Sequence, residues 1–151
     1  MDKKTLIVGY GNPLRSDDGV GQAAAQILEN EDVAEGVEVL SYHQLNIELA
    51  ERLSTVDLAI FIDAEDGIQP GSVVVTKLES VTTAPSNITH HVDPGFLLAV
   101  SEKLFGRSPE AFLVTVGTTS MTLGEGLSET VAAALPEVVA SVRRLVLEHL
   151  R

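Results

Sequence analysis

The sequence predicts an α/β sandwich built on a largely parallel sheet. Short apolar runs typical of buried strands alternate along the chain with segments whose apolar residues recur at helical spacing. Turn residues separate these segments, and no repeat, linker or low-complexity tract interrupts the alternation. Strands that alternate with helices favour parallel pairing, because each helix carries the chain back across the sheet. The length of 151 residues and a hydrophobic content of 44% suit one domain spanning residues 1–151.

The first half of the chain predicts three strands and two helices. The strands are apolar runs, each followed by a glycine or a polar residue, at Thr5–Tyr10, Val37–Tyr42 and Val56–Ile62. Apolar residues at helical spacing predict helices over Gly19–Glu29 and Ile47–Leu53.

The second half predicts two further strands and two longer helices. The Pro70-Gly71 turn opens a valine-rich strand over Gly71–Leu78, and another strand is predicted at Phe112–Val116. Pro94 suits the first turn of a helix, where its missing N–H has no partner to lose. The last helix is predicted from Ser128 to the C-terminus, with a break or kink around Leu135 because Pro136 follows.

Charge and composition exclude several classes of partner. Ten Lys and Arg against 22 Asp and Glu give a net charge of −12, which repels nucleic acid and anionic membrane surfaces and attracts a cationic peptide or a metal ion. No apolar run approaches the ~20 residues that cross a bilayer, and the short apolar stretch near the N-terminus indicates a buried strand and not a signal peptide. The chain has no cysteine, so any metal must be bound by carboxylates, imidazoles, carbonyls or water. We therefore expect a cytoplasmic protein with no nucleic-acid or membrane partner.

A glycine-rich turn with two adjacent carboxylates follows the first strand. Gly9-Tyr10-Gly11-Asn12 resembles a dinucleotide-binding turn, but Leu14 stands where the third glycine would be, so a nucleotide site is poorly supported. Asp17 and Asp18 then precede the first helix. Taken alone, such a pair is more often a helix cap than a functional site.

Two more groups of polar residues are expected at the same edge of the sheet. Asp63 ends the third predicted strand, although it could instead cap the turn at residues 65–67. The carboxyl ends of parallel strands meet at one edge, where ligands of open α/β sheets bind, so Asp63 should approach the Asp17-Asp18 pair. His90 and His91 precede the Pro94 helix, where one of them could cap that helix. Carboxylates and an imidazole on loops at one edge make a plausible open metal site. His43 and His149, the two remaining histidines, are predicted to be surface residues.

Together these motifs resemble the nickel–iron hydrogenase maturation endopeptidases. Residues 9–21, Gly-Tyr-Gly-Asn-Pro-Leu-Arg-Ser-Asp-Asp-Gly-Val-Gly, resemble the N-terminal signature of that family. Phe61-Ile62-Asp63-Ala64 resembles its second motif, and Thr89-His90 followed by residues 97–100 resembles its third. Gly126-Leu127-Ser128 fits its C-terminal pattern. The ordered set spans nearly the whole chain.

The resemblance implies a fold, a metal site and a substrate. The fold is a three-layer sandwich with a mostly parallel, five-stranded twisted sheet between helices. The metal site and catalytic residues fall on Asp18, Asp63 and His90, with His91 as an alternative histidine. The substrate is the precursor of a hydrogenase large subunit that already carries nickel, and the reaction removes its C-terminal peptide. Zinc or another divalent ion could substitute for nickel, because the ligand types suit both. Asp17 is expected to serve the turn or a helix cap, so Asp17→Asn should retain most activity and Asp18→Asn should not.

Two other functions remain open on the sequence alone. Asp18 and Asp63 could act as a proton-sharing pair in an aspartyl-type peptidase. The protein could also be a non-catalytic, nickel-dependent scaffold or checkpoint in metalloenzyme assembly.

Overall fold

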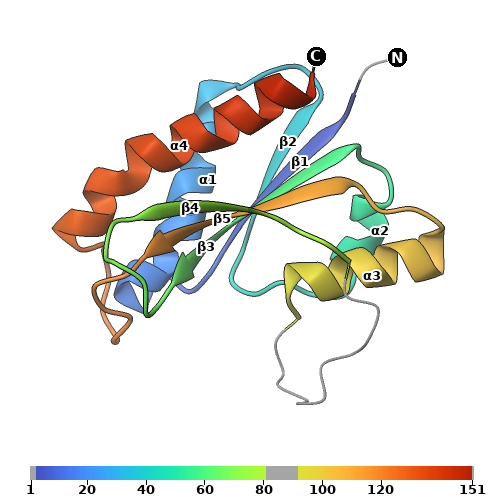
Figure 1. Cartoon of the computed structure of the whole chain (residues 1–151). Coiled ribbons are helices and arrows are strands. Elements are labelled where there is room, and N and C mark those ends of the chain that lie inside the picture. Colours follow the sequence, from blue (N-terminus) through green and yellow to red (C-terminus); the bar gives the residue numbers. More distant parts are fainter. Residues whose placement is uncertain (1–2, 81–91, 151) are drawn as a thin grey trace.

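The computed structural model describes residues 3–80 and 92–150, which form a five-stranded sheet between helical layers (Figure 1). The strand order is β2-β1-β3-β5-β4. Strands β1, β2, β3 and β5 run parallel, and β4 is antiparallel to β5. The strand bounds are Thr5–Tyr10 for β1, Val37–Tyr42 for β2, Leu58–Glu65 for β3, Val73–Lys77 for β4 and Glu110–Gly117 for β5. The predicted mostly parallel three-layer fold is confirmed.

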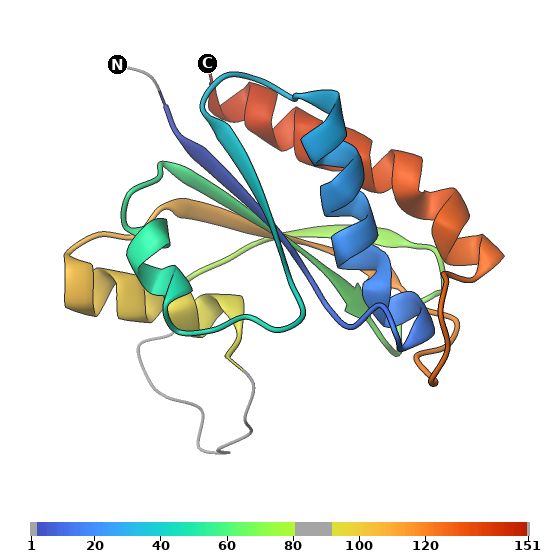
Figure 2. The same ribbon diagram turned by 180° about the vertical axis from the view of Figure 1, so that it is seen from behind.

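The helices cover both faces of the sheet and create two apolar cores. Helices α1 (Val20–Glu31) and α4 (Glu129–His149) cover one face, and α2 (Leu49–Leu53) and α3 (Pro94–Phe105) cover the other (Figure 2). Residues 58–62 of β3 are all fully buried, with Ile60 directed to the α1/α4 core and Phe61 to the α2/α3 core. A central parallel strand is buried on both faces, which explains its unbroken apolar sequence.

Helix α3 begins where the sequence predicts it, and its first turn is capped. Pro94 is the first helical residue, and the Asp93 side chain accepts a hydrogen bond of 2.8 Å from the Phe96 N–H. Asp93 therefore satisfies one of the N–H groups that have no partner within the helix.

The predicted end of β3 and the predicted break in the last helix were wrong. Strand β3 continues past Ile62 to Glu65, because Asp63, Ala64 and Glu65 pair with β5. Helix α4 is one continuous element through Pro136, with no break at Leu135. Pro136 and Ala132 both lie on the exposed side of α4, so the Ala132 carbonyl that the proline leaves without a helical donor is open to water.

Helix α1 packs unusually close to the sheet, and Gly21 makes that approach possible. A Cβ atom at Gly21 would lie 2.4 Å from the Ile62 carbonyl oxygen and 2.6 Å from that of Tyr10. Both carbonyls belong to rigid strand backbone, so a side chain would force the helix away from the sheet.

Gly21→Ala is therefore expected to reduce the free energy of unfolding by about 1–3 kcal/mol, as other overpacked sites do. Chemical denaturation measures the loss. Gln26→Ala, at an exposed position of the same helix, is the control and should change stability by less than about 0.5 kcal/mol. Equal stability of the two variants would contradict the close approach.

Within the described ranges, none of the helices is both long enough and apolar enough to cross a membrane.

Candidate functional site

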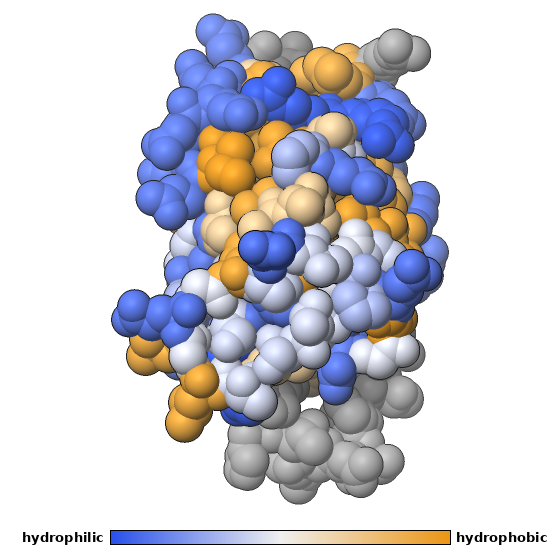
Figure 3. All heavy atoms as spheres, turned by 90° about the vertical axis from the view of Figure 1, so that its left-hand side faces the viewer, coloured by the Kyte–Doolittle hydropathy of each residue, from blue (hydrophilic) through white to orange (hydrophobic). Residues whose placement is uncertain are grey.

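A pocket of about 350 Å³ opens at the carboxyl ends of β1, β2 and β3. This is the edge at which open α/β sheets bind ligands. Its lining combines three aspartates with an arginine, a histidine and several polar or apolar residues: Tyr10, Gly11, Asn12, Arg15, Asp18, His43, Gln44, Leu45, Asp63, Val92 and Asp93. The molecular face at this edge mixes weakly polar surface with charged and apolar groups (Figure 3).

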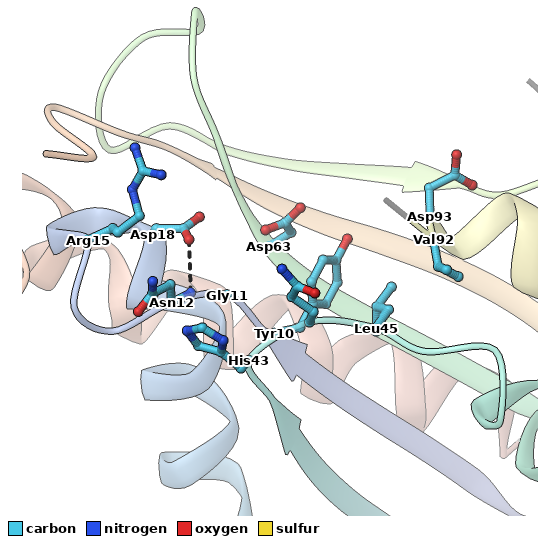
Figure 4. A pocket seen from close by; sticks show the side chains of 11 residues that line it. Tyr10, Gly11, Asn12, Arg15, Asp18, His43, Leu45, Asp63, Val92 and Asp93 are labelled. Carbon is cyan, nitrogen blue, oxygen red and sulfur yellow. Dashed lines mark hydrogen bonds between the residues drawn. The ribbon is translucent and has the colours of Figure 1, made fainter. Parts of the chain in front are cut away.

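Asp18 is positioned by a tight turn after β1. The turn leads into a short 3-10 helix, Ser16–Gly19, and Asp18 Oδ2 accepts a hydrogen bond of 2.8 Å from the Asn12 N–H (Figure 4). Gly11 permits this turn, because its φ of 139° is in the region that favours glycine and a Cβ there would lie 2.0 Å from the Asp18 carbonyl oxygen. The hydrogen bond occupies one carboxylate oxygen of Asp18. Within residues 3–80 and 92–150, the other oxygen has no hydrogen-bond donor.

Asp63 was predicted to end the third strand, and it lies in β3 two residues before the strand ends. Its Oδ1 accepts a hydrogen bond of 2.8 Å from the Ala64 N–H. Gly9 of β1 pairs with Ile62, so Tyr10 and Asp63 are the next residues along two adjacent strands. Figure 4 shows the Tyr10 hydroxyl and the Asp63 carboxylate side by side in the pocket.

This environment changes the acidity of both groups. Burial raises the pKa of Asp63 from 3.8 to about 6, and the negative charge of Asp18 adds to the rise. Interaction with the Tyr10 hydroxyl and the Ala64 N–H partly opposes it. Burial, together with the charge of Asp63, raises the pKa of Tyr10, so its hydroxyl keeps its proton at neutral pH. A carboxyl group with a pKa near neutrality, in a cleft beside a second carboxylate, is typical of a functional site.

Asp17 points away from the pocket and binds a different part of the chain. Its side chain is fully buried and accepts hydrogen bonds from the Thr119, Ser120 and Ser128 N–H groups and from the Ser128 hydroxyl. Although burial raises its pKa, these four donors outweigh that effect and the pKa of Asp17 is lowered. Neither aspartate caps α1, whose N-cap is Gly19. Asp17 instead holds residues 119–128 against the start of the site, and it supports the N-cap of α4, Ser128.

The structure thus brings two of the three predicted site residues together. Asp18 and Asp63 line the same pocket, as expected from the strand ends that carry them. His90 and His91 lie outside the described residues, so the third ligand stays a prediction. Within residues 3–80 and 92–150, no group of three or more His, Cys, Asp or Glu side chains is close enough to hold a metal ion.

Several lining residues were not singled out by sequence analysis. His43 is exposed, as predicted, yet it lines the pocket because β2 ends at the same edge as β1 and β3. Its place directly after a predicted strand was the available signal. Arg15 also lines the pocket. Its guanidinium Nε donates a hydrogen bond of 3.1 Å to the Met121 carbonyl oxygen, and this bond holds the side chain in place. Asp93 lines the pocket while it caps α3.

The five-stranded sheet between helical layers is a fold that this chain shares with solved structures of hydrogenase maturation proteases. The endopeptidase HybD from E. coli is 22% identical, with a TM-score of 0.74 over 97% of this chain and 93% of that one. The protease HycI from Thermococcus kodakarensis is 20% identical, with a TM-score of 0.75 over 94% and 91%. The hydrogenase 2 maturation peptidase from a Thaumarchaeota archaeon is 22% identical, with a TM-score of 0.70 over 95% and 98%. Comparisons with protein-family models and with curated proteins each found no match.

Proposed function

We propose that this protein is a cytoplasmic endopeptidase that removes the C-terminal peptide from the nickel-loaded precursor of a hydrogenase large subunit. The observation that carries the proposal is the shared pocket of Asp18 and Asp63, at the carboxyl edge of a fold that matches maturation proteases along nearly their full length. The shared fold by itself assigns no chemistry to this edge. The paired carboxylates add a chemical reason to place a metal-dependent reaction at this edge.

In this proposal the nickel belongs to the substrate, and the protein recognises it. Asp18 offers a carboxylate oxygen that accepts no hydrogen bond within the described chain. Asp63 offers a second carboxylate from β3, the strand next to β1. His90 would supply an imidazole. This set of oxygen and nitrogen ligands suits nickel, and also zinc or another divalent ion. Bound there, a metal would activate water, polarise the scissile carbonyl or anchor the precursor for cleavage.

The protein's own groups prepare the pocket for such a substrate. The Asn12 N–H fixes one oxygen of Asp18, and the Ala64 N–H and Tyr10 hydroxyl orient Asp63. Partners of this kind direct ligand atoms before the metal arrives and are part of a metal site. Because Asp63 must be ionised to bind a cation, a pKa of about 6 makes recognition weaken in mildly acidic solution.

Mass spectrometry of the precursor tests this function directly. A nickel-loaded precursor incubated with the protein should lose its C-terminal peptide, and the nickel-free precursor should remain intact. Stable binding of the nickel-loaded precursor without any mass change would support the non-catalytic scaffold instead. Equal cleavage of both precursors would rule out nickel recognition and favour the aspartyl-type mechanism.

A separate prediction concerns the two adjacent histidines. His90→Ala is expected to reduce cleavage of the nickel-loaded precursor by at least about a hundredfold, as loss of a metal-binding side chain would. His91→Ala is the matched control and should retain most activity, because Thr89-His90 matches the order of the family motif. Single-turnover cleavage measures both. An inactive His91 variant beside an active His90 variant would reverse the assignment.

A further inference from the structure

Strand β4 forms one edge of the sheet and carries an open row of backbone groups. It is the last strand in the order β2-β1-β3-β5-β4, so within the described ranges its outer side faces no other strand (Figure 1). An unpaired strand edge is a template for another extended chain, and proteins often use it to bind peptides.

The hydrogen bonds between β4 and β5 identify which backbone groups of β4 point away from β5. The Gly117 N–H donates to the Ser72 carbonyl oxygen at 2.9 Å, and the Leu78 N–H donates to the Ala111 carbonyl oxygen at 2.9 Å. In an antiparallel pair, alternate residues face the partner strand, so the even-numbered residues from 72 to 78 bond to β5. The N–H and C=O groups of Val73, Val75 and Lys77 therefore point outward.

The side chains along this edge suit an extended, apolar peptide. Val74 and Val75 are each 42% exposed, and successive residues of a strand face opposite sides of the sheet. An added strand would thus cover apolar surface on both faces at once. Lys77, at the end of β4 far from the pocket, is the one charged residue of this strand. Edge strands that must stay unpaired usually carry more charge, proline or a bulge.

The edge is aligned with the candidate site. Val74 pairs with Thr115, and Thr115 pairs with Asp63, so the three residues form one row across the sheet. A strand added outside β4 would lie three strand spacings from Asp63, or about 14 Å. An extended chain spans that distance with about four residues.

We propose that the outer edge of β4 binds the C-terminal tail of the precursor as an added β-strand. This inference rests on the proposed function, which supplies the tail as the occupant, and it assigns the surface that holds the tail beyond the scissile bond. The first four or so residues after that bond would cross from Asp63 to the edge. The following residues would pair with Val73, Val75 and Lys77.

Val75→Pro tests the backbone pairing. Proline removes the outward N–H of Val75 but no donor to β5, and edge strands tolerate it at such positions. The KM for the nickel-loaded precursor should rise about tenfold, the effect of losing one or two hydrogen bonds with their packing. Thr76→Ser is the control: the backbone groups of Thr76 bond to β5 and not to the tail, so this variant should leave the KM within about twofold. An unchanged KM in a folded Val75→Pro variant would overturn the proposal.

A synthetic tail peptide provides a second test that uses the unmodified protein. In amide NMR spectra, the peptide should shift the signals of Val73, Val75 and Lys77 more than those of Val74 and Thr76. Methylating the tail nitrogens that pair with β4 should weaken binding about tenfold, while methylating the alternate nitrogens should not. Equal effects of both methylation patterns would overturn the proposal, even if Val75→Pro fails to fold.

Precursors with C-terminal tails of different length distinguish a failure of this proposal from a failure of the proposed function. Precursors with fewer than about four residues after the scissile bond cannot reach the edge, so Val75→Pro should not change their KM. Absence of cleavage by the wild-type protein would refute the peptidase function, and the peptide spectra would still decide the edge. A dimer that Val75→Pro dissociates, with cleavage unaffected, would assign the edge to a second copy of the chain and overturn the proposal.

Discussion

Asp63→Asn is expected to abolish precursor cleavage and at the same time stabilise the metal-free protein at neutral pH. Cleavage should fall by at least about a thousandfold, because asparagine has the shape of aspartate but no charge to bind a cation. Stability should rise because burial beside Asp18 disfavours the Asp63 carboxylate. A functional group held at a cost to stability is common in active sites.

The direction and pH range of the stability effect follow from the pKa. Folding raises the pKa of Asp63 from 3.8 to about 6, so the folded protein binds the proton more tightly than the unfolded chain. The ionised group therefore opposes folding fully above pH 6, less between pH 6 and 3.8, and not at all below pH 3.8. A shift of about two units corresponds to at most about 3 kcal/mol, and partial exposure of the side chain makes 1–2 kcal/mol a better expectation.

Thermal unfolding of the metal-free variants across this pH range measures the effect. Asp57→Asn is the control of opposite sign, because hydrogen bonds from the Lys4 N–H and Arg107 lower the pKa of Asp57. Asp57 thus supports folding in its ionised form, and its replacement should reduce stability at neutral pH. If Asp63→Asn is as stable as the wild type at pH 7, the carboxylate is better solvated than its surroundings indicate.

The sheet and its layers could be predicted from local sequence because each strand is a short apolar run between turn residues. The same runs placed Asp18 and Asp63 at one edge, since parallel strands end together. The end of β3 could not be predicted, because Asp63 and Glu65 are polar and belong to the strand only through pairing with β5. The break predicted at Pro136 was wrong for a similar reason. Its local effect on the helix depends on whether the freed carbonyl meets water, which is a property of the folded surface.

The different roles of Asp17 and Asp18 also depend on contacts remote in sequence. Both aspartates stand before a helix, so local sequence predicted a cap for one of them. The donors to Asp17 come from residues 119–128, more than 100 positions away. His43 reached the pocket through the strand order, which places β2 next to β1. Such pairings are set by the whole fold, and no short motif encodes them.

Asp17→Asn is expected to reduce the free energy of unfolding more than Asp18→Asn does. Asp17 Oδ2 accepts from the Thr119 N–H at 2.9 Å, the Ser120 N–H at 3.2 Å and the Ser128 hydroxyl at 3.0 Å, while Oδ1 accepts from the Ser128 N–H at 2.7 Å. Asparagine has one acceptor oxygen, so in either orientation its NH₂ group faces at least one backbone N–H. A buried donor left without an acceptor, together with loss of the charge, should cost about 2–4 kcal/mol.

Chemical denaturation of Asp17→Asn and Asp18→Asn at several pH values separates the two roles. The lowered pKa of Asp17 means that its contribution is complete above pH 3.8 and is lost as the pH falls through the lower, folded-state value, so the difference from wild type should shrink in acid. Asp18→Asn should stay within about 1 kcal/mol of wild type, because an asparagine oxygen can still accept from the Asn12 N–H. We therefore expect folded Asp17→Asn to retain most activity, as the sequence predicted, and Asp18→Asn to lose cleavage while it remains folded. A stable Asp17→Asn beside an unfolded Asp18→Asn would contradict these roles, and would show that Asp18, not Asp17, holds residues 119–128 in place.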